Sequence, residues 1–295
     1  MEKTTFGSWK NCYRMTNGEM ELVAVADIGP RVMRLGRVGG PNMFGEVPGA
    51  GEGDWKLYGG HRLWHAPEGL PRSYEPDNDP VEVETTDGAL RLTQKTEPHT
   101  MIQKRIEISL REDDKCATLR HTLWNRGMWP VTLAPWCLTI MQKEGYSFCP
   151  WPSGEFTSLQ PCGPVVMWPY TDMNDTRMIV LRSALVFHQD PKLSRRLKLG
   201  FACNEGWAGW TKGGDLFIKR FDHVPDAMYP DFGCSVELFC NDLIAEVETV
   251  APLTLLEPGE SVTHVERWYV FSGVDFDGTQ EKFEKNILPC VKGTR

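Results

Sequence analysis

The sequence predicts an all-β protein, built as one large antiparallel β-sandwich with little helix. Short runs of alternating apolar and polar residues, separated by turn residues, recur along most of the 295 residues. A dozen or more such runs follow one another without the helices that parallel strands need between them. Helical periodicity is confined to residues 279–287, near the C-terminus. Together these observations indicate antiparallel sheets packed face to face.

The first expected strand, residues 21–26, follows an Asn17-Gly18 dipeptide, which is a strong signal for a hairpin turn. Asp87-Gly88 and Gly213-Gly214 are expected to form further tight turns. The Pro- and Gly-rich windows 39–53 and 67–80 are expected to be loops within the series. The remaining strands are expected at residues 81–85, 89–94, 101–110, 116–125, 131–141, 165–168, 184–187, 198–203, 206–211, 216–221, 235–240, 244–250 and 261–271. With no repeat, low-complexity block or linker, residues 1–295 are expected to form one domain.

The composition is that of a globular protein, with 41% hydrophobic and 24% charged residues. Acidic residues outnumber basic ones by 40 to 32, which argues against a nucleic-acid binder. No apolar run reaches the ~18 residues of a membrane-spanning helix, and the first residues lack the apolar stretch of a secretory signal. We therefore expect a cytoplasmic protein without membrane contact, as a monomer or homodimer.

The nine cysteines are scattered and form no CxxC pair, so reduced thiols are expected rather than a zinc site. Eleven tryptophans are an unusual number. Indole rings stack well on the C–H faces of sugars, but they also fill large β cores. The sequence contains no phosphate-binding loop, no dinucleotide-binding glycine motif and no nucleophile elbow, so phosphoryl-transfer, hydride-transfer and serine-hydrolase activities lose support. No cofactor is expected.

Three segments together resemble the galactose mutarotase (aldose 1-epimerase) superfamily. Residues 17–32 are similar to its first hairpin, and residues 59–67 (GGHRLWHAP) to its Gly-Gly segment beside the sugar. Residues 231–260 are similar to its ending, where a strand carries the catalytic Glu and a "Leu-x-Pro-Gly-Glu" turn follows. The pattern is most similar to an uncharacterised bacterial branch, known as a domain of unknown function. The resemblance implies a β supersandwich and a carbohydrate-active protein, with an isomerase acting at the anomeric centre as one possibility.

The resemblance supplies a base but not the usual acid. Glu237 falls on the general-base position of the superfamily. Residues 130–136 (PVTLAPW) match the segment that ends in the superfamily's acid, a His, but Trp136 stands in that place. An indole cannot deliver a proton, so Trp136 is expected to contact the sugar instead.

His61 and His65 are the expected replacement acids, because imidazole titrates near neutral pH. In an extended segment His61 and His65 lie on one side, whereas Arg62 and Trp64 lie on the other. Together with a carboxylate the two histidines could instead hold a divalent metal, or they could fix the loop by hydrogen bonds. Arg62 and Trp64 are expected to bind sugar, with a cation–π pair on the surface of the loop as the alternative.

Lys219 and Asp231 are further expected substrate contacts. Lys219 could neutralise buried carboxylates or meet an acidic sugar. Glu246 and Glu248 share one face of a strand and are expected to form structural ion pairs, and His121 is expected to lie on a sheet face.

Three functions remain open at this level: an epimerase, a carbohydrate-binding protein without catalysis, and a lyase or hydrolase on the same scaffold. The expected partner is a sugar or oligosaccharide.

Overall fold

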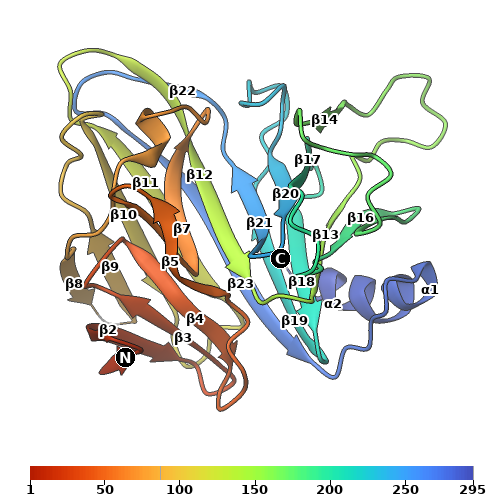
Figure 1. Cartoon of the computed structure of the whole chain (residues 1–295), viewed down its shortest axis with the longest axis horizontal. Helices are drawn as coiled ribbons and strands as arrows, with labels where there is room; N and C mark the ends of the chain where they lie inside the picture. The colour runs from red at the N-terminus through yellow and green to blue at the C-terminus, as the bar shows by residue number, and fades with distance from the viewer. Residues whose placement is uncertain (87, 295) are drawn as a thin grey trace.

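The computed structural model describes residues 1–86 and 88–294, and the expected turn residue Asp87 lies outside them. Two large antiparallel sheets make up most of the molecule and confirm the predicted all-β sandwich (Figure 1). Strand 131–141 is β12 with the predicted bounds, and Gly18 occupies the turn between β2 and β3 with a φ of +91°.

The first sheet carries the strands that position the site. Its central strands are β7 (His61–Ala66), β12 (Val131–Met141), β21 (Ala245–Val250), β20 (Val236–Cys240) and β17 (Leu197–Phe201), in that order, and β14 (Val165–Met167) follows at the edge. On the other side of β7 lie, in order, β4 (Arg31–Arg37), β3 (Met20–Val25), β2 (Trp9–Thr16) and β1 (Glu2–Phe6), while β22 (Thr254–Leu256) pairs with β12.

The second sheet packs against the inner face of the first. Its strands, in spatial order, are β15 (Met178–Val180), β16 (Ala184–His188), β13 (Tyr146–Pro150), β18 (Trp207–Lys212), β19 (Asp215–Phe221), β23 (Ser261–Ser272), β11 (Ala117–Asn125), β10 (Ile102–Ser109), β9 (Ala89–Thr93) and β8 (Glu82–Thr86). The main core lies between the sheets, where buried side chains such as Leu63, Cys137 and Val247 of the first sheet meet Leu119 and Phe217 of the second. Their burial provides the main stabilising free energy of the sandwich.

Two smaller elements lie outside the sheets. The window 39–53, expected to be a loop, contains β5 (Glu46–Glu52), which pairs with β6 (Trp55–Gly59) as a separate hairpin. The window 67–80 contains a single 3₁₀ turn, η1 (Arg72–Tyr74). The C-terminal helical segment runs further than predicted, through α1 (Gln280–Lys282), the π-helical turn η2 (Phe283–Ile287) and α2 (Leu288–Lys292).

This C-terminal segment covers the outer face of the second sheet beside β18 and β19 (Figure 1). In the described part of the chain, no helix has the length and apolar character needed to cross a membrane.

Candidate functional site

A cleft of about 720 Å³ lies on the outer face of the first sheet. Its floor is made by side chains that alternate outward along the central strands, including Arg62 of β7, Trp136 of β12 and Glu248 of β21. The register places these side chains in rows, because Trp136 faces Trp64 across the strands and Glu237 faces Glu248. The inward-facing neighbours on the same strands belong to the main core.

Aromatic side chains form much of the wall of the cleft. Trp55 of the β5–β6 hairpin lies edge-on to Trp64, with ring centroids 5.7 Å apart, and Tyr74 lies 4.9 Å from Trp64. The ring centroids of Trp64 and Trp136 are 5.6 Å apart, and Tyr170 also lines the cleft. Such rings present flat apolar surfaces on which a ligand can stack.

Arg62 is buried at the floor of the cleft, with its guanidinium 4.5 Å from the centre of the Trp64 ring. Its Nη2 lies 3.3 Å from Glu246 Oε1, whereas Nε and Nη1 have no hydrogen-bond partner. Burial raises the pKa of Glu246 to about 7, although Arg62 opposes the shift. The pair therefore offers free N–H donors beside a carboxyl group that titrates near neutral pH.

Lys198 of β17 joins two carboxylates at the other end of the floor. Its Nζ lies 2.6 Å from Glu237 Oε2 and 3.0 Å from Glu248 Oε2, and 4.9 Å from the centre of the Trp136 ring. Trp136 Nε1 also donates to Glu248 Oε2 at 2.8 Å. Burial would lower the pKa of Lys198, but the carboxylates Glu237 and Glu248 raise it above its usual value.

Glu237, the expected base, is completely buried and does not line the cleft. Burial raises its pKa well above the usual value, and the charges of Glu248 and Asp231 add to this while Lys198 opposes it. Burial likewise raises the pKa of Asp231, whose carboxyl contacts Glu237. One ammonium thus faces three carboxyl groups, and of these Glu248 is the one that lines the cleft.

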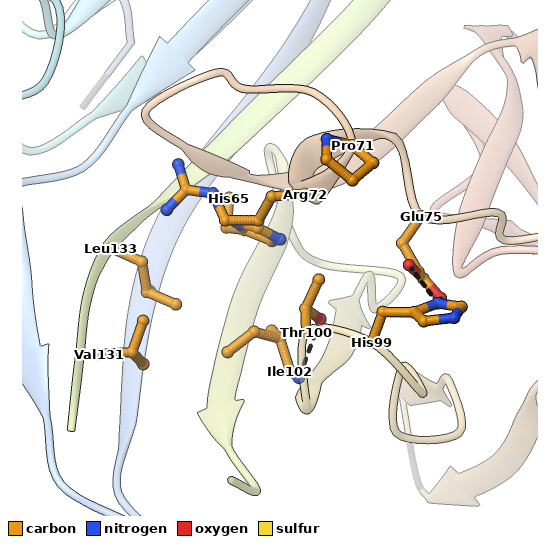
Figure 2. A pocket seen from close by; sticks show the side chains of 9 residues that line it. All are labelled: His65, Pro71, Arg72, Glu75, His99, Thr100, Ile102, Val131 and Leu133. Atoms are coloured by element: carbon orange, nitrogen blue, oxygen red, sulfur yellow. Dashed lines mark hydrogen bonds and ion pairs between the residues drawn. The ribbon is translucent and has the colours of Figure 1, made fainter. Parts of the chain in front are cut away.

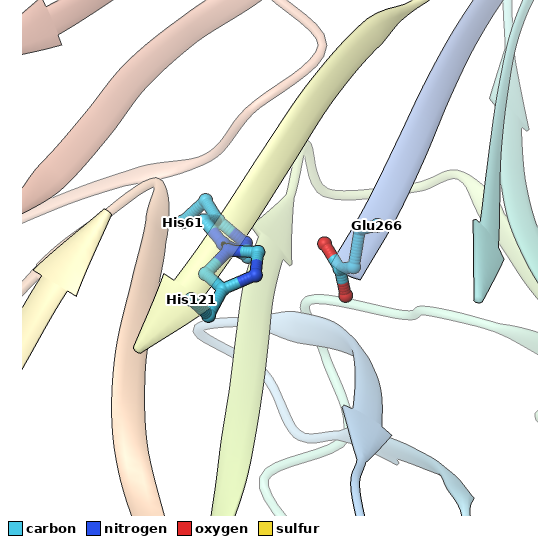
Figure 3. Close-up of side chains that lie close together, drawn as sticks. All are labelled: His61, His121 and Glu266. Atoms are coloured by element: carbon cyan, nitrogen blue, oxygen red, sulfur yellow. Dashed lines mark hydrogen bonds between the residues drawn. The ribbon is translucent and has the colours of Figure 1, made fainter. Parts of the chain in front are cut away.

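The predicted alternation along β7 is present, but it turns His61 away from the cleft into the space between the sheets. There His61 Nε2 lies 2.7 Å from His121 Nε2 (Figure 3). On the other side of the ring, His61 Nδ1 lies 2.8 Å from Thr139 Oγ1. Both histidines are completely buried. His61 is therefore separated from Glu237 by the sheet itself.

Lys219 also lies between the sheets and does not reach the cleft. Its Nζ donates to Glu266 Oε1 at 2.9 Å and to Thr139 Oγ1 at 2.8 Å. Atoms of His61, His121 and Glu266 lie within 4.8 Å of one another, close enough to hold a metal ion. Lys219 already supplies the positive charge beside this carboxylate, so the donor set favours a hydrogen-bonded network over a cation.

His65 faces a second cavity on the same inner side of β7. Two residues four apart on a strand are separated by ~13 Å, so His61 and His65 cannot share one metal ion. The structure brings neither histidine to Glu237. Of the expected contacts, Arg62, Trp64 and Trp136 line one cleft, whereas Asp231 does not line it and contacts Glu237.

Several cleft residues were not singled out as ligand contacts by the sequence, among them Lys198, Trp55, Glu246 and Glu248. The expected ion pairs of Glu246 and Glu248 are present, with Arg62 and Lys198. A charged residue within an otherwise apolar strand was the available signal for Lys198, because such a residue must meet an opposite charge when buried.

No protein-family model matches the sequence, and no curated protein sequence matches it. Solved structures do match. A TPR-domain containing protein from Parabacteroides distasonis has a TM-score of 0.59 and 16% identity over 90% of this chain. The chain spans about half of that protein, 47% of its length.

Two further matches cover most of both chains. A galactose mutarotase related enzyme from Lactobacillus acidophilus has a TM-score of 0.58 and 11% identity, over 90% of this chain and 98% of that one. A candidate aldose 1-epimerase from Klebsiella pneumoniae has a TM-score of 0.58 and 11% identity, over 97% and 85%. Likeness at such low identity reports on architecture alone. The chain has the galactose mutarotase-like β-sandwich fold.

Proposed function

We propose that the chain binds a sugar in the cleft of the first sheet and interconverts its anomers. The observation that carries the proposal is the composition of the floor, where two carboxyl groups, Glu246 and Glu248, lie side by side beneath aromatic walls. They project from the same face of β21 two residues apart, roughly 7 Å along the strand. That spacing suits two groups that act on different atoms of one sugar ring.

Anomer exchange needs one proton removed and one proton delivered. The base takes the proton of the C1 hydroxyl while the acid protonates the ring oxygen, and the C1–O5 bond breaks to give the open aldehyde. Rotation about the adjacent bond and the reverse steps give the other anomer. We assign the base to Glu248, which binds Lys198 and Trp136 through Oε2 and leaves Oε1 for the sugar. Glu246, with its pKa of about 7, is the acid.

Glu237, to which the superfamily resemblance assigns the base, takes a different part in this proposal. It holds Lys198 in place, and Lys198 in turn binds Glu248. Arg62 offers its free Nε and Nη1 to sugar hydroxyls.

The test is the rate of α/β exchange measured by NMR for galactose and glucose. We expect the wild-type protein to exceed the buffer rate, and Glu248→Gln and Glu246→Gln to reduce the enzymatic rate about a hundredfold or more. Glu82→Gln, at an exposed position on β8, is the matched control and should keep the full rate. Full activity in both Glu248→Gln and Glu246→Gln would refute the assignment.

A binding protein without catalysis is the second candidate. It is favoured by the Lys198 ammonium, which lies against the carboxyls at that end of the floor and competes with a proton for them. In that case the sugars bind saturably, and exchange in the presence of the wild-type protein stays at the buffer rate.

A further inference from the structure

A second cavity, of about 500 Å³, lies on the inner side of β7, opposite to the cleft. Side chains from both sheets enclose it, namely Val131 and Leu133 at the start of β12 and Ile102 at the start of β10. Pro71, next to η1, adds a fourth apolar wall. A cavity of this size is within the range of small-molecule sites.

His65 lines this cavity with an imidazole that has no partner. The residue is 1% exposed, and neither Nδ1 nor Nε2 makes a hydrogen bond. The nearest carboxylate oxygen, Glu97 Oε2, is 3.9 Å from Nε2, too far for a hydrogen bond. Burial lowers the pKa of His65 to about 3, and the neighbouring cations Lys104 and Arg72 add to this, so the ring is neutral. A buried donor and a buried acceptor that are left unpaired destabilise the fold.

One cation in the cavity wall, Arg72, has no carboxylate partner among the described residues. Glu97 pairs with Lys104 at 2.5 Å, and Glu75 pairs with His99 at 2.9 Å. Arg72 donates to the carbonyl of Pro67, but no carboxylate of the described residues forms an ion pair with it. Figure 2 shows the guanidinium of Arg72 directed toward the side of Leu133, away from the Glu75–His99 pair.

We propose that this cavity is a binding site for a small carboxylic acid with an apolar body, an aliphatic or aromatic monocarboxylate. The carboxylate accepts hydrogen bonds from Arg72 and from the imidazole N–H of His65. The apolar body packs on Ile102, Val131 and Leu133, which face the same space. This arrangement satisfies the orphaned donor of His65 and neutralises the unpaired guanidinium in one step.

The site is independent of the sugar cleft, because the two open on opposite faces of β7. Only the segment around Pro71 takes part in both walls. A failure of the sugar proposal therefore leaves this one standing, and the reverse also holds.

Calorimetric titration with octanoate, octan-1-ol and acetate tests the proposal. We expect saturable binding of octanoate. Octan-1-ol, which lacks the charge, and acetate, which lacks the apolar body, should each bind at least tenfold more weakly. Arg72→Gln should weaken octanoate about tenfold, whereas Arg120→Gln, an exposed arginine on β11, should leave it unchanged. No saturable binding of octanoate, or equal binding by Arg72→Gln, would overturn the proposal.

Two further measurements separate a lost site from a misfolded protein. The NMR signal of the His65 ring C–H should shift on addition of octanoate, and not on addition of acetate at the same concentration. Leu133→Trp should fill the cavity and abolish octanoate binding while the circular dichroism spectrum stays that of the wild type. An unmoved His65 signal at saturation would place the octanoate elsewhere and refute the site.

Discussion

Glu246 is the residue whose ionisation lies nearest to neutral pH in the cleft. Burial holds its pKa at about 7 against the opposing charge of Arg62. An acid must carry its proton before the reaction, so the rate of anomer exchange should fall as the pH rises through about 7. Anomer exchange rates measured by NMR between pH 5 and 9, corrected for the exchange rate in buffer alone, measure this fall. The Glu246→Gln variant should exchange anomers more slowly than the wild type, and its rate should not fall as the pH rises through about 7. A fall that persists in the variant would assign the titration to another group.

The residues of β7 illustrate what the sequence could predict at this scale. Alternation correctly separates His61 and His65 from Arg62 and Trp64, because successive side chains on a strand point to opposite faces. The sequence could not tell which face meets the ligand, since both faces carry polar groups. His61 lies inside because His121 and Thr139, from distant strands, satisfy its ring nitrogens. Such partners become visible only when the strands are paired.

Among the structural elements, the β5–β6 hairpin makes the clearest contribution to the cleft. Glycines at 49, 51 and 53 made residues 39–53 look like a loop, yet the segment pairs and carries Trp55 into the wall. The hairpin lies outside both sheets, so the alternation of the main strands gives no indication of it. A short strand rich in glycine has little periodicity from which to be predicted.

Trp55 supplies an aromatic face to the sugar in the proposed site. Trp55→Ala should weaken sugar binding about tenfold, or about 1.4 kcal/mol, because one stacking surface is lost. Titration calorimetry with the sugar that shows the fastest exchange measures the change. Trp129→Ala removes an exposed indole outside the cleft and should bind as the wild type does. Equal affinities in the two variants would remove the hairpin from the sugar site.

The C-terminal helical segment stabilises the second sheet. Phe283 is completely buried, with its ring 5.5 Å from that of Phe148. Phe283→Ala should lower the free energy of unfolding by roughly 3–5 kcal/mol, because it removes a large buried ring and leaves a cavity. Urea unfolding measures this, with Phe156→Ala at a fully exposed position as control, expected to change stability by less than about 0.5 kcal/mol. A small effect of Phe283→Ala would show that the segment detaches without cost to the sandwich.

For the whole molecule, strand content was predictable because alternation is a local property of the chain. The pairing of strands was not, because it depends on contacts between distant residues. Lys198 meets Glu237 and Glu248 only because β17, β20 and β21 are neighbours in the first sheet. The interior network joins Lys219 and Glu266 of the second sheet to Thr139 of the first. The sequence thus predicts a sandwich, whereas the location of its buried charges follows from the three-dimensional arrangement.

This polar interior makes the stability of the sandwich depend on pH. Burial lowers the pKa of His121 and of His264 to about 4, and that of His61 well below its usual value, despite the nearby charge of Glu266. In the unfolded chain histidine has a pKa near 6.5. Between pH 6.5 and 4 these histidines therefore bind protons in the unfolded state but stay neutral in the folded state. The free energy of unfolding should therefore fall as the pH drops through this range, by up to about 1.4 kcal/mol per pH unit for each histidine. The raised pKa values of Glu237 and Glu246 act in the opposite direction above pH 4.5, where the folded state holds protons that the unfolded chain releases.

The histidines should dominate this balance, because His65 and His223 also have lowered pKa values, which makes five histidines against the three carboxyl groups with raised values, Glu237, Glu246 and Asp231. Urea midpoints measured from pH 7.5 down to 4.5 should decrease steadily. His121→Asn removes one of the buried imidazoles and should flatten the slope, whereas Arg120→Gln, at an exposed position on β11, should keep the wild-type slope. If the midpoint of the wild type is constant over this range, or if His121→Asn keeps its slope, the imidazoles of the interior are already protonated in the folded protein. The network of Lys219 and Glu266 would then have to accommodate added positive charge, contrary to the neutral arrangement argued from its contacts.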